Sequence, residues 1–215
     1  MSATSEWVYA GIEQEILLRV LPAVRHDLLG ALTTIHLTAH VMLRKLASNT
    51  MPPEQCVDRV QLMLDTATAA TDGIRALRRW DPQSEGDYDI CEVAEFAIQL
   101  MQENLRVRQL EVRLEPSDAG EGTKVTGRFL YGVLSVLCLI EDTCEAHARL
   151  VMRSTGYGVE VEFLASSPAG TADPAETACQ PHQRTFDTSL VSDYLTARGM
   201  QLLTQASSWR LVIAG

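Results

Sequence analysis

The stretch Val24-Arg25-His26-Asp27-Leu28-Leu29-Gly30-Ala31-Leu32-Thr33 opens a segment with the pattern of one long helix. Apolar residues recur along this segment at alternating steps of four and three, the heptad seam of a helix packed along another helix: Leu28, Leu32, Ile35, Ala39, Met42 and Leu46. His26 falls beside this seam. Gly30 and Thr33 share its side of the helix, because residues about one and two turns apart face the same way. The pattern predicts a packed helix that presents a histidine and an adjacent acid to solvent.

A second helix is predicted from about residue 54 to residue 80, after a break at residues 48–50 and a pair of prolines that suit a helix start. Two adjacent apolar seams run along it. One consists of Val57, Val60, Leu64, Ala67, Thr71 and Ile74, and the other of Cys56, Val60, Met63, Ala67, Ala70, Ile74 and Leu77. A helix with two seams contacts two neighbours at once. We therefore predict an antiparallel hairpin that forms a homodimeric four-helix bundle through residues of about 23–80. The alternative is a bundle closed within one chain by residues 5–21.

Two interruptions divide the chain. Before the main helix, Val8, Ile12, Ile16 and Val20 recur at steps of four until Pro22, which predicts a kink or a separate short first helix. After the second helix, residues 81–87 combine a proline, a glycine and three acids. This composition predicts a boundary between a helical unit at residues 1–82 and a second unit at residues 83–215.

The second unit has the alternating pattern of an α+β domain. Strands are predicted at residues 88–90, 110–114, near 125, 150–153, 159–164, 200–203 and 209–213, and helices at 91–106, 128–145 and 189–198. Residues 116–123 and 165–182 have the composition of polar loops. This order of elements predicts helices on one side of a mixed sheet.

Charge and composition narrow the classes of function. The 215 residues carry a net charge of −10, and residues 83–215 hold 19 of the 28 acids but ten of the 18 bases. That balance argues against binding of nucleic acid or of an anionic membrane through residues 83–215. Five scattered cysteines without paired spacing argue against a zinc site or a disulfide framework. Since the sequence has neither a secretory signal pattern nor an apolar run near membrane length, we expect a cytoplasmic protein.

The helical hairpin followed by an α/β unit resembles the core of a histidine kinase. The residues His26-Asp27-Leu28-x-x-x-Leu32-Thr33 resemble that family's phosphoacceptor box, usually His-(Glu/Asp)-Leu-x-x-Pro-Leu-Thr, while Gly30 and Ala31 depart from it. The resemblance covers nearly the whole chain in its layout, and this box matches residue by residue. It implies that His26 is a phosphoacceptor.

The second unit departs from the family at the positions that would bind ATP. Where the family carries two asparagines on a helix, this chain has Val136 and Ile140, which offer no oxygen ligand to Mg²⁺. Where the family has Asp-x-Gly-x-Gly, this chain reads Ala-Ser-Ser-Pro-Ala-Gly at residues 165–170, and a Gly-x-Gly lid motif is also absent before Ser189. We therefore expect no ATP binding and no cofactor.

A retained histidine box beside an eroded nucleotide site is similar to the dimeric histidine phosphotransferases. That resemblance implies that His26 accepts a phosphoryl group from an aspartyl phosphate on one response-regulator receiver domain and passes it to another. An imidazole with its ordinary pKa of about 6.5 is a good nucleophile near neutral pH. The receiver would supply Mg²⁺, so this chain would contribute position and a docking face.

For most of the other residues near the box, a functional role and a purely structural one are both possible. Asp27 is either an acid that orients the His26 ring or a solvated acid. Gly30 either leaves room for a receiver or is a mild helix defect, and without a side chain it cannot position a water for dephosphorylation. Thr33 completes the partner-facing surface. Four arginines either contact an acidic receiver or are simply solvated: Arg25, Arg75, Arg78 and Arg79.

Two rival functions share these features. One is a non-catalytic pseudokinase dimer that binds and regulates a receiver or a kinase. The other is an ATP-dependent sensor histidine kinase, which would require the nucleotide-site interpretation to be wrong at three motifs. His36 and His40 lie one turn apart, but no third metal-binding residue stands at a matching turn nearby, so we expect no metal site there.

Overall fold

The structure is a computed structural model that describes residues 3–80, 88–115, 123–164, 185–205 and 208–213. The chain divides into two compact units, and the first of them consists of two pieces, Met1–Val20 and Arg79–Gly215. The second unit is Leu21–Arg78. This division differs from the predicted one, since it places the first 20 residues with the α/β elements. The predicted boundary segment, residues 81–87, lies outside the described residues.

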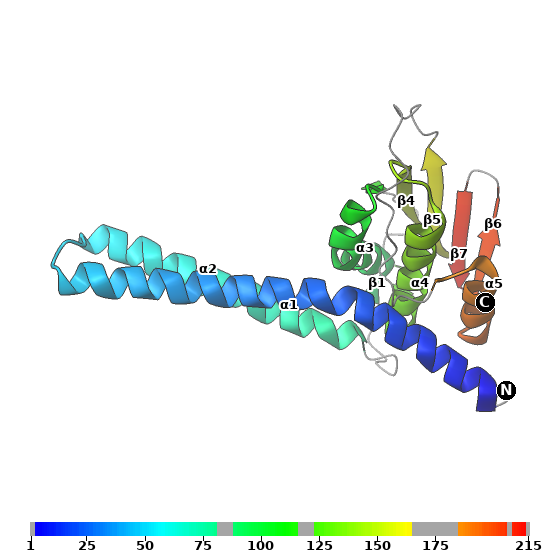
Figure 1. The fold of residues 1–215 in the computed structure, drawn as a ribbon, viewed down its shortest axis with the longest axis horizontal. Coiled ribbons are helices and arrows are strands. Elements are labelled where there is room, and N and C mark those ends of the chain that lie inside the picture. The colour runs from blue at the N-terminus through cyan, green and yellow to red at the C-terminus, as the bar shows by residue number, and fades with distance from the viewer. Residues whose placement is uncertain (1–2, 81–87, 116–122, 165–184, 206–207, 214–215) are drawn as a thin grey trace. The chain divides into compact units, whose positions relative to one another are not determined.

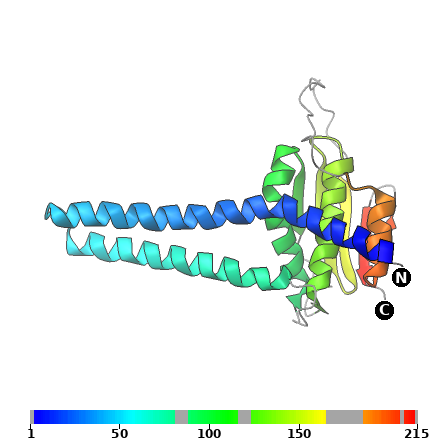
Figure 2. The same ribbon diagram turned by 60° about the horizontal axis from the view of Figure 1, so that its bottom comes forward.

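Helix α1 spans Ala3–Ala47 and helix α2 spans Pro53–Ala76, followed by the short 3-10 helix η1 at Leu77–Trp80 (Figure 1). The helices in the Leu21–Arg78 unit form the predicted antiparallel hairpin (Figures 1 and 2). Pro22 lies inside α1, so the expectation of a separate first helix is wrong. A proline inside a helix removes one backbone hydrogen bond. The helix nevertheless continues through Pro22, and the residues before it are held by the burial of Ile16 and Val20.

The hairpin buries little of its own apolar surface. Among its described side chains, Thr38 and Met42 are buried. The α2 seam that contains Cys56, Met63 and Ala70 is half-buried at these positions. All six residues of the other α2 seam are exposed: Val57, Val60, Leu64, Ala67, Thr71 and Ile74. The two predicted seams share Val60, Ala67 and Ile74, so the second seam is half-buried only at its other positions, and the first seam faces solvent along its whole length in the single chain.

The α/β unit contains a five-stranded mixed sheet in the order β2-β4-β5-β7-β6. Its strands are β2 (Glu111–Glu115), β4 (Arg149–Thr155), β5 (Gly158–Leu164), β6 (Met200–Thr204) and β7 (Ser208–Ile213). Strands β2 and β4 are parallel, and the other neighbours are antiparallel. The strands β1 (Tyr88–Asp89) and β3 (Lys124–Val125) form a separate antiparallel pair. The predicted α+β class and mixed sheet are confirmed.

Three helices belong to the described part of this unit besides the start of α1: α3 (Ile90–Val107), α4 (Gly127–Thr143) and α5 (Thr188–Ala197). Helices α3 and α5 begin where an aspartate side chain accepts a backbone N–H, from Cys91 to Asp89 and from Leu190 to Asp187. Helix α4 is buried on nearly every side, from Phe129 to Glu141. It is the centre of the unit's core.

One face of the sheet is covered by helices, and the other carries charged residues. On the strands' solvent side, Arg153 pairs with Glu115 and Glu162 across three neighbouring strands. On the opposite face, Leu150, Met152 and Val161 are at most 2% exposed. This alternation of buried and charged positions is what the period of a strand requires.

The start of α1 packs on the α/β unit. Ile12, Ile16 and Val20 are at most 4% exposed, and the first part of α1 crosses α4 in both views and α5 in Figure 2 (Figures 1 and 2). The alternative of a bundle closed within one chain by residues 5–21 is therefore wrong, because the apolar face of that segment is used elsewhere. No helix in the described ranges has both the length and the apolar character of a membrane span.

Candidate functional site

His26 lies on the exposed surface of α1 in the hairpin unit. Its side chain is 84% exposed, as is that of Asp27. The ring nitrogen Nδ1 lies 3.3 Å from Oδ1 of Asp27, so the carboxylate is in position to accept a ring N–H and leave Nε2 as the nucleophilic nitrogen. A helix backbone holds the histidine in place while its ring is open to solvent.

The side of α1 around His26 is unobstructed. A Cβ atom built on Gly30 would meet nothing within 4 Å. The Thr33 hydroxyl donates a 2.7 Å hydrogen bond to the backbone oxygen of Leu29, so it is engaged in its own helix. Leu37, two further turns along from Gly30, is 62% exposed. These positions lie at helical spacing on one side, and together they form an open surface one to three turns beyond His26.

The four arginines differ in their surroundings. Arg25 is exposed next to His26, and Arg75 pairs with Asp72 at 3.1 Å on α2. The side chains of Arg78 and Arg79 lie outside the described set. A pair of exposed residues three apart on one helix contributes little to stability, so Arg75 is available to a partner at low cost.

The two helix positions that the resemblance assigned to ATP ligands are both buried. Val136 is 3% exposed and Ile140 is 0% exposed, within α4. Aliphatic side chains in the core offer no oxygen to Mg²⁺ or phosphate. The Ala-Ser-Ser-Pro-Ala-Gly segment at residues 165–170 lies outside the described residues.

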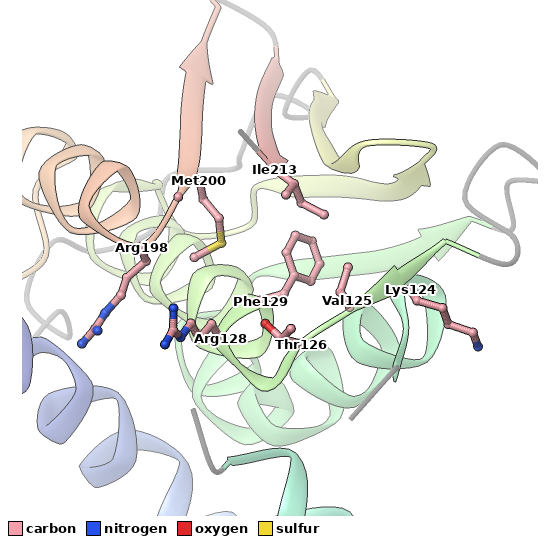
Figure 3. Close-up of a pocket in the computed structure, with 9 residues that line it drawn as sticks. Lys124, Val125, Thr126, Arg128, Phe129, Arg198, Met200 and Ile213 are labelled. Carbon is pink, nitrogen blue, oxygen red and sulfur yellow. The ribbon is translucent and has the colours of Figure 1, made fainter. Parts of the chain in front are cut away.

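A small cavity of about 230 Å³ lies at the other end of α4. Figure 3 shows Phe129, Met200 and Ile213 around it, with the guanidinium groups of Arg128 and Arg198 together on one side and Lys124 directed away. It adjoins the first turn of α4, whereas Val136 and Ile140 lie in the second half of that helix. The cavity is therefore separate from the positions that the resemblance linked to ATP. Within the described ranges no group of three or more His, Cys, Asp or Glu side chains is arranged to hold a metal ion.

The sequence interpretation missed a buried ionic cluster. The guanidinium group of Arg19, with its side chain 1% exposed, donates to Glu141 at 3.0 Å and to both oxygens of Asp142 at 3.0 and 2.9 Å. Its Nε lies 3.6 Å from Glu15. In the sequence, Glu15 and Arg19 stand four residues apart beside an apolar stripe. Such a pair is also common on exposed helix surfaces, so the sequence alone does not show that α4 buries it.

Burial raises the pKa of the Glu141 carboxyl, and the positive charge of Arg19 lowers it in part. Since the folded pKa lies above the unfolded one, Glu141 favours the folded state at pH values below its unfolded pKa, and that contribution is lost as the pH rises through the folded pKa. At pH values above the folded pKa, the ionised Glu141 carboxylate therefore lowers the free energy of unfolding relative to its protonated form. Asp142 still satisfies Arg19 if Glu141 is neutral.

We predict that Glu141→Gln leaves the melting temperature at pH 7 equal to or above that of the wild type. As the pH falls toward the ordinary pKa of a glutamate, 4.5, the wild type should gain stability relative to the variant, because its own carboxyl becomes neutral. Thermal unfolding of both proteins across this pH range measures the difference. A loss of several degrees in the variant at pH 7 would contradict the prediction.

No protein-family model and no curated protein matches this chain. Among solved structures, it is similar to the cytoplasmic segment of the histidine kinase QseC, with 12% identity and a TM-score of 0.42 over 69% of this chain and 92% of that one. It is also similar to a histidine kinase from Burkholderia phymatum, with 13% identity and a TM-score of 0.41 over 89% and 98%. A bacterial phosphotransferase is similar over 98% of this chain and 96% of that one, with 13% identity and a TM-score of 0.36.

Proposed function

We propose that this protein is a histidine phosphotransferase that relays phosphoryl groups between response-regulator receiver domains through His26. The observation that carries the proposal is an 84% exposed histidine, placed at the first position of a His-Asp-Leu-x-x-x-Leu-Thr box, on a packed helix with an open surface beside it. The alternative is a pseudokinase that binds the same partner without accepting phosphate.

The transfer needs few groups from this chain. A neutral ring nitrogen of His26 attacks the phosphorus atom of the receiver's aspartyl phosphate, a nitrogen–phosphorus bond forms, and the phosphorus–oxygen bond to the aspartate breaks to release the carboxylate. After Nε2 of His26 has attacked, the proton on Nδ1 of the imidazole passes to solvent or to Asp27. The reverse steps deliver the phosphoryl group to a second receiver. Mg²⁺ in the receiver neutralises the phosphoryl oxygens, so no cofactor is required here.

The open surface near His26 fits a partner that approaches along α1. Gly30 adds no side chain one turn beyond the histidine, and Thr33 presents a hydroxyl already bonded to its own helix. Neither residue offers a free group to position a water, which favours transfer over hydrolysis of the receiver's phosphate. Arg25 next to His26 and Arg75 on α2 supply positive charge, which complements an acidic receiver surface. We propose the same role for Arg78 and Arg79, because they follow Arg75 closely in the sequence.

A homodimer is part of this proposal. Among the described side chains of the hairpin unit, Thr38 and Met42 are buried, while one complete α2 seam is exposed. Two helices alone cannot bury enough apolar surface to hold a straight hairpin of this length, and a second copy supplies the missing faces of a four-helix bundle. The second copy is the simplest occupant, because the first part of α1 is already committed to the α/β unit.

We also propose that the protein does not bind ATP. The buried Val136 and Ile140 replace the two expected asparagines. A ligand that binds the folded state raises the melting temperature by mass action. We expect Mg²⁺–ATP at millimolar concentration to leave the melting temperature unchanged, as measured by thermal unfolding with and without nucleotide. A saturable increase would contradict this and would favour the ATP-dependent kinase.

The direct test is to mix the protein with phosphorylated candidate receivers and to measure transferred label that is stable in base and labile in acid, as a phosphohistidine is. Appearance of such label supports the phosphotransferase. If a receiver binds the protein but no label moves with any receiver, the pseudokinase function is the correct one.

A further inference from the structure

The α/β unit is assembled from two separate pieces of chain. Residues 1–20 belong to it, the hairpin Leu21–Arg78 follows, and the chain returns to the unit at Arg79. The hairpin is therefore an insertion, and it is connected to the α/β unit at both of its ends. One of these connections depends on noncovalent docking of the first part of α1, which we call the N-terminal segment, residues 3–20.

The N-terminal segment is attached at two polar points that alternate along the helix with buried apolar residues. Past its middle, Glu13 accepts hydrogen bonds from Arg198 at 2.6 Å and from the Tyr194 hydroxyl at 3.2 Å. Near its end, Arg19 donates to Glu141 and Asp142 on α4. Ile12, Ile16 and Val20 supply the buried apolar contact.

The Arg19 cluster is unbalanced without its arginine. The guanidinium group faces three carboxylates, those of Glu15, Glu141 and Asp142, and it also lies over the Phe186 ring at 4.9 Å. Asp142 additionally accepts the backbone N–H of Phe186 at 2.6 Å. Removing one partner of a buried ion pair leaves uncompensated charge, which is far more costly than the net stability of the intact pair. The geometry thus fixes where the segment docks, while the net free energy that it contributes is modest.

Most of the apolar core of the α/β unit lies outside the N-terminal segment. Helices α3, α4 and α5 and the five-stranded sheet hold most of the buried apolar residues of the chain. Pro22 follows two residues after Val20 and lacks the backbone N–H that would continue the helix ladder. A segment with a small buried strip, next to such a weakened point, is suited to open while the larger core stays folded.

We propose that the N-terminal segment is a latch, held by the Arg19 cluster, that controls how freely the α/β unit moves relative to the hairpin. With the latch docked, the unit is attached through both helices of the hairpin. With the latch open, only the chain connection after α2 joins the rest of the α/β unit to the hairpin. This device does not require His26 to accept a phosphoryl group, so it stands or falls independently of the proposed function.

The test is hydrogen exchange by mass spectrometry on the full chain, in the wild type, Arg19→Ala, Arg19→Lys and the control Gln14→Ala at an exposed position of the same segment. We expect the amides of residues 9–20 to exchange at least about a hundredfold faster in Arg19→Ala, with β4 and β5 still protected. Arg19→Lys should fall between, since it keeps the charge but loses the forked geometry. Gln14→Ala should match the wild type.

Two results would overturn the latch. One is unchanged exchange of residues 9–20 in Arg19→Ala, and the other is loss of protection in β4 and β5 together with the segment, which would make the segment an integral part of the core. If Arg19→Ala does not fold, wild-type exchange at low urea decides: the latch requires residues 9–20 to open at lower urea and with a smaller urea dependence than β4 and β5.

A second measurement addresses the movement itself. Spin labels are introduced as unnatural amino acids at two exposed positions, Gln55 on α2 and Gln201 on β6. The labelled chain is diluted with an excess of unlabelled chain, so that distances between labels in different copies of the chain do not contribute. We expect the distribution of distances between the labels to be broader in Arg19→Ala than in the wild type. Equal distributions, with the segment shown to be open, would refute the control of movement.

Discussion

Replacing His26 with glutamine should abolish transfer of label from a phosphorylated receiver. Glutamine keeps a polar side chain of similar length but has no nucleophilic ring nitrogen, so no nitrogen–phosphorus bond can form. His26 is 84% exposed, and exposed substitutions usually change stability by within about 0.5 kcal/mol. The melting temperature and the oligomeric state should therefore stay near those of the wild type while the label disappears.

The matched control is His36→Gln, an exposed histidine on the same helix. It should keep full label uptake, because it lies outside the phosphoacceptor box. Receiver binding should survive in His26→Gln, since docking uses the helix surface and not the ring alone. Continued labelling of His26→Gln would place the acceptor elsewhere in the chain.

Placing an aspartate at Leu64 should convert the proposed dimer into monomers or into unfolded protein. Leu64 is 56% exposed in the single chain and lies on the α2 seam that α1 does not cover. In a two-fold symmetric bundle the substitution enters the interface twice, so it buries two unpaired and mutually repelling charges. A penalty of about 4 kcal/mol or more would raise the dimer dissociation constant at least about a thousandfold.

Sedimentation equilibrium of the wild type and of the variant measures this change. The control is Leu62→Asp, which lies on the opposite side of α2 and is 42% exposed; it should remain dimeric. A monomeric wild type would remove the homodimer from the proposed function, and a dimeric Leu64→Asp would place the interface on another surface.

Local patterns in the sequence were sufficient for most of the elements, because they depend on neighbours along the chain. The alternation of β4 and β5 around a short turn marks a hairpin, and Asp89 and Asp187 stand where a helix start needs an acceptor for a free backbone N–H. The His26 surface also follows from spacing alone, since residues on one helix side are fixed by its period. The exposed α2 seam was predictable as a seam, although not as the one that α1 leaves open.

The tertiary structure alone decided what covers the first part of α1. The strip of Ile12, Ile16 and Val20 shows that one side of the helix is buried, but the pattern does not identify which element covers it. Arg19 had the appearance of a surface arginine paired with Glu15, and only the position of α4 places it among buried carboxylates. Local periodicity therefore determined the helices, the strands and the exposed histidine. The assignment of residues 3–20 to the α/β unit depended on contacts between residues more than 120 positions apart in the chain, which no local pattern encodes.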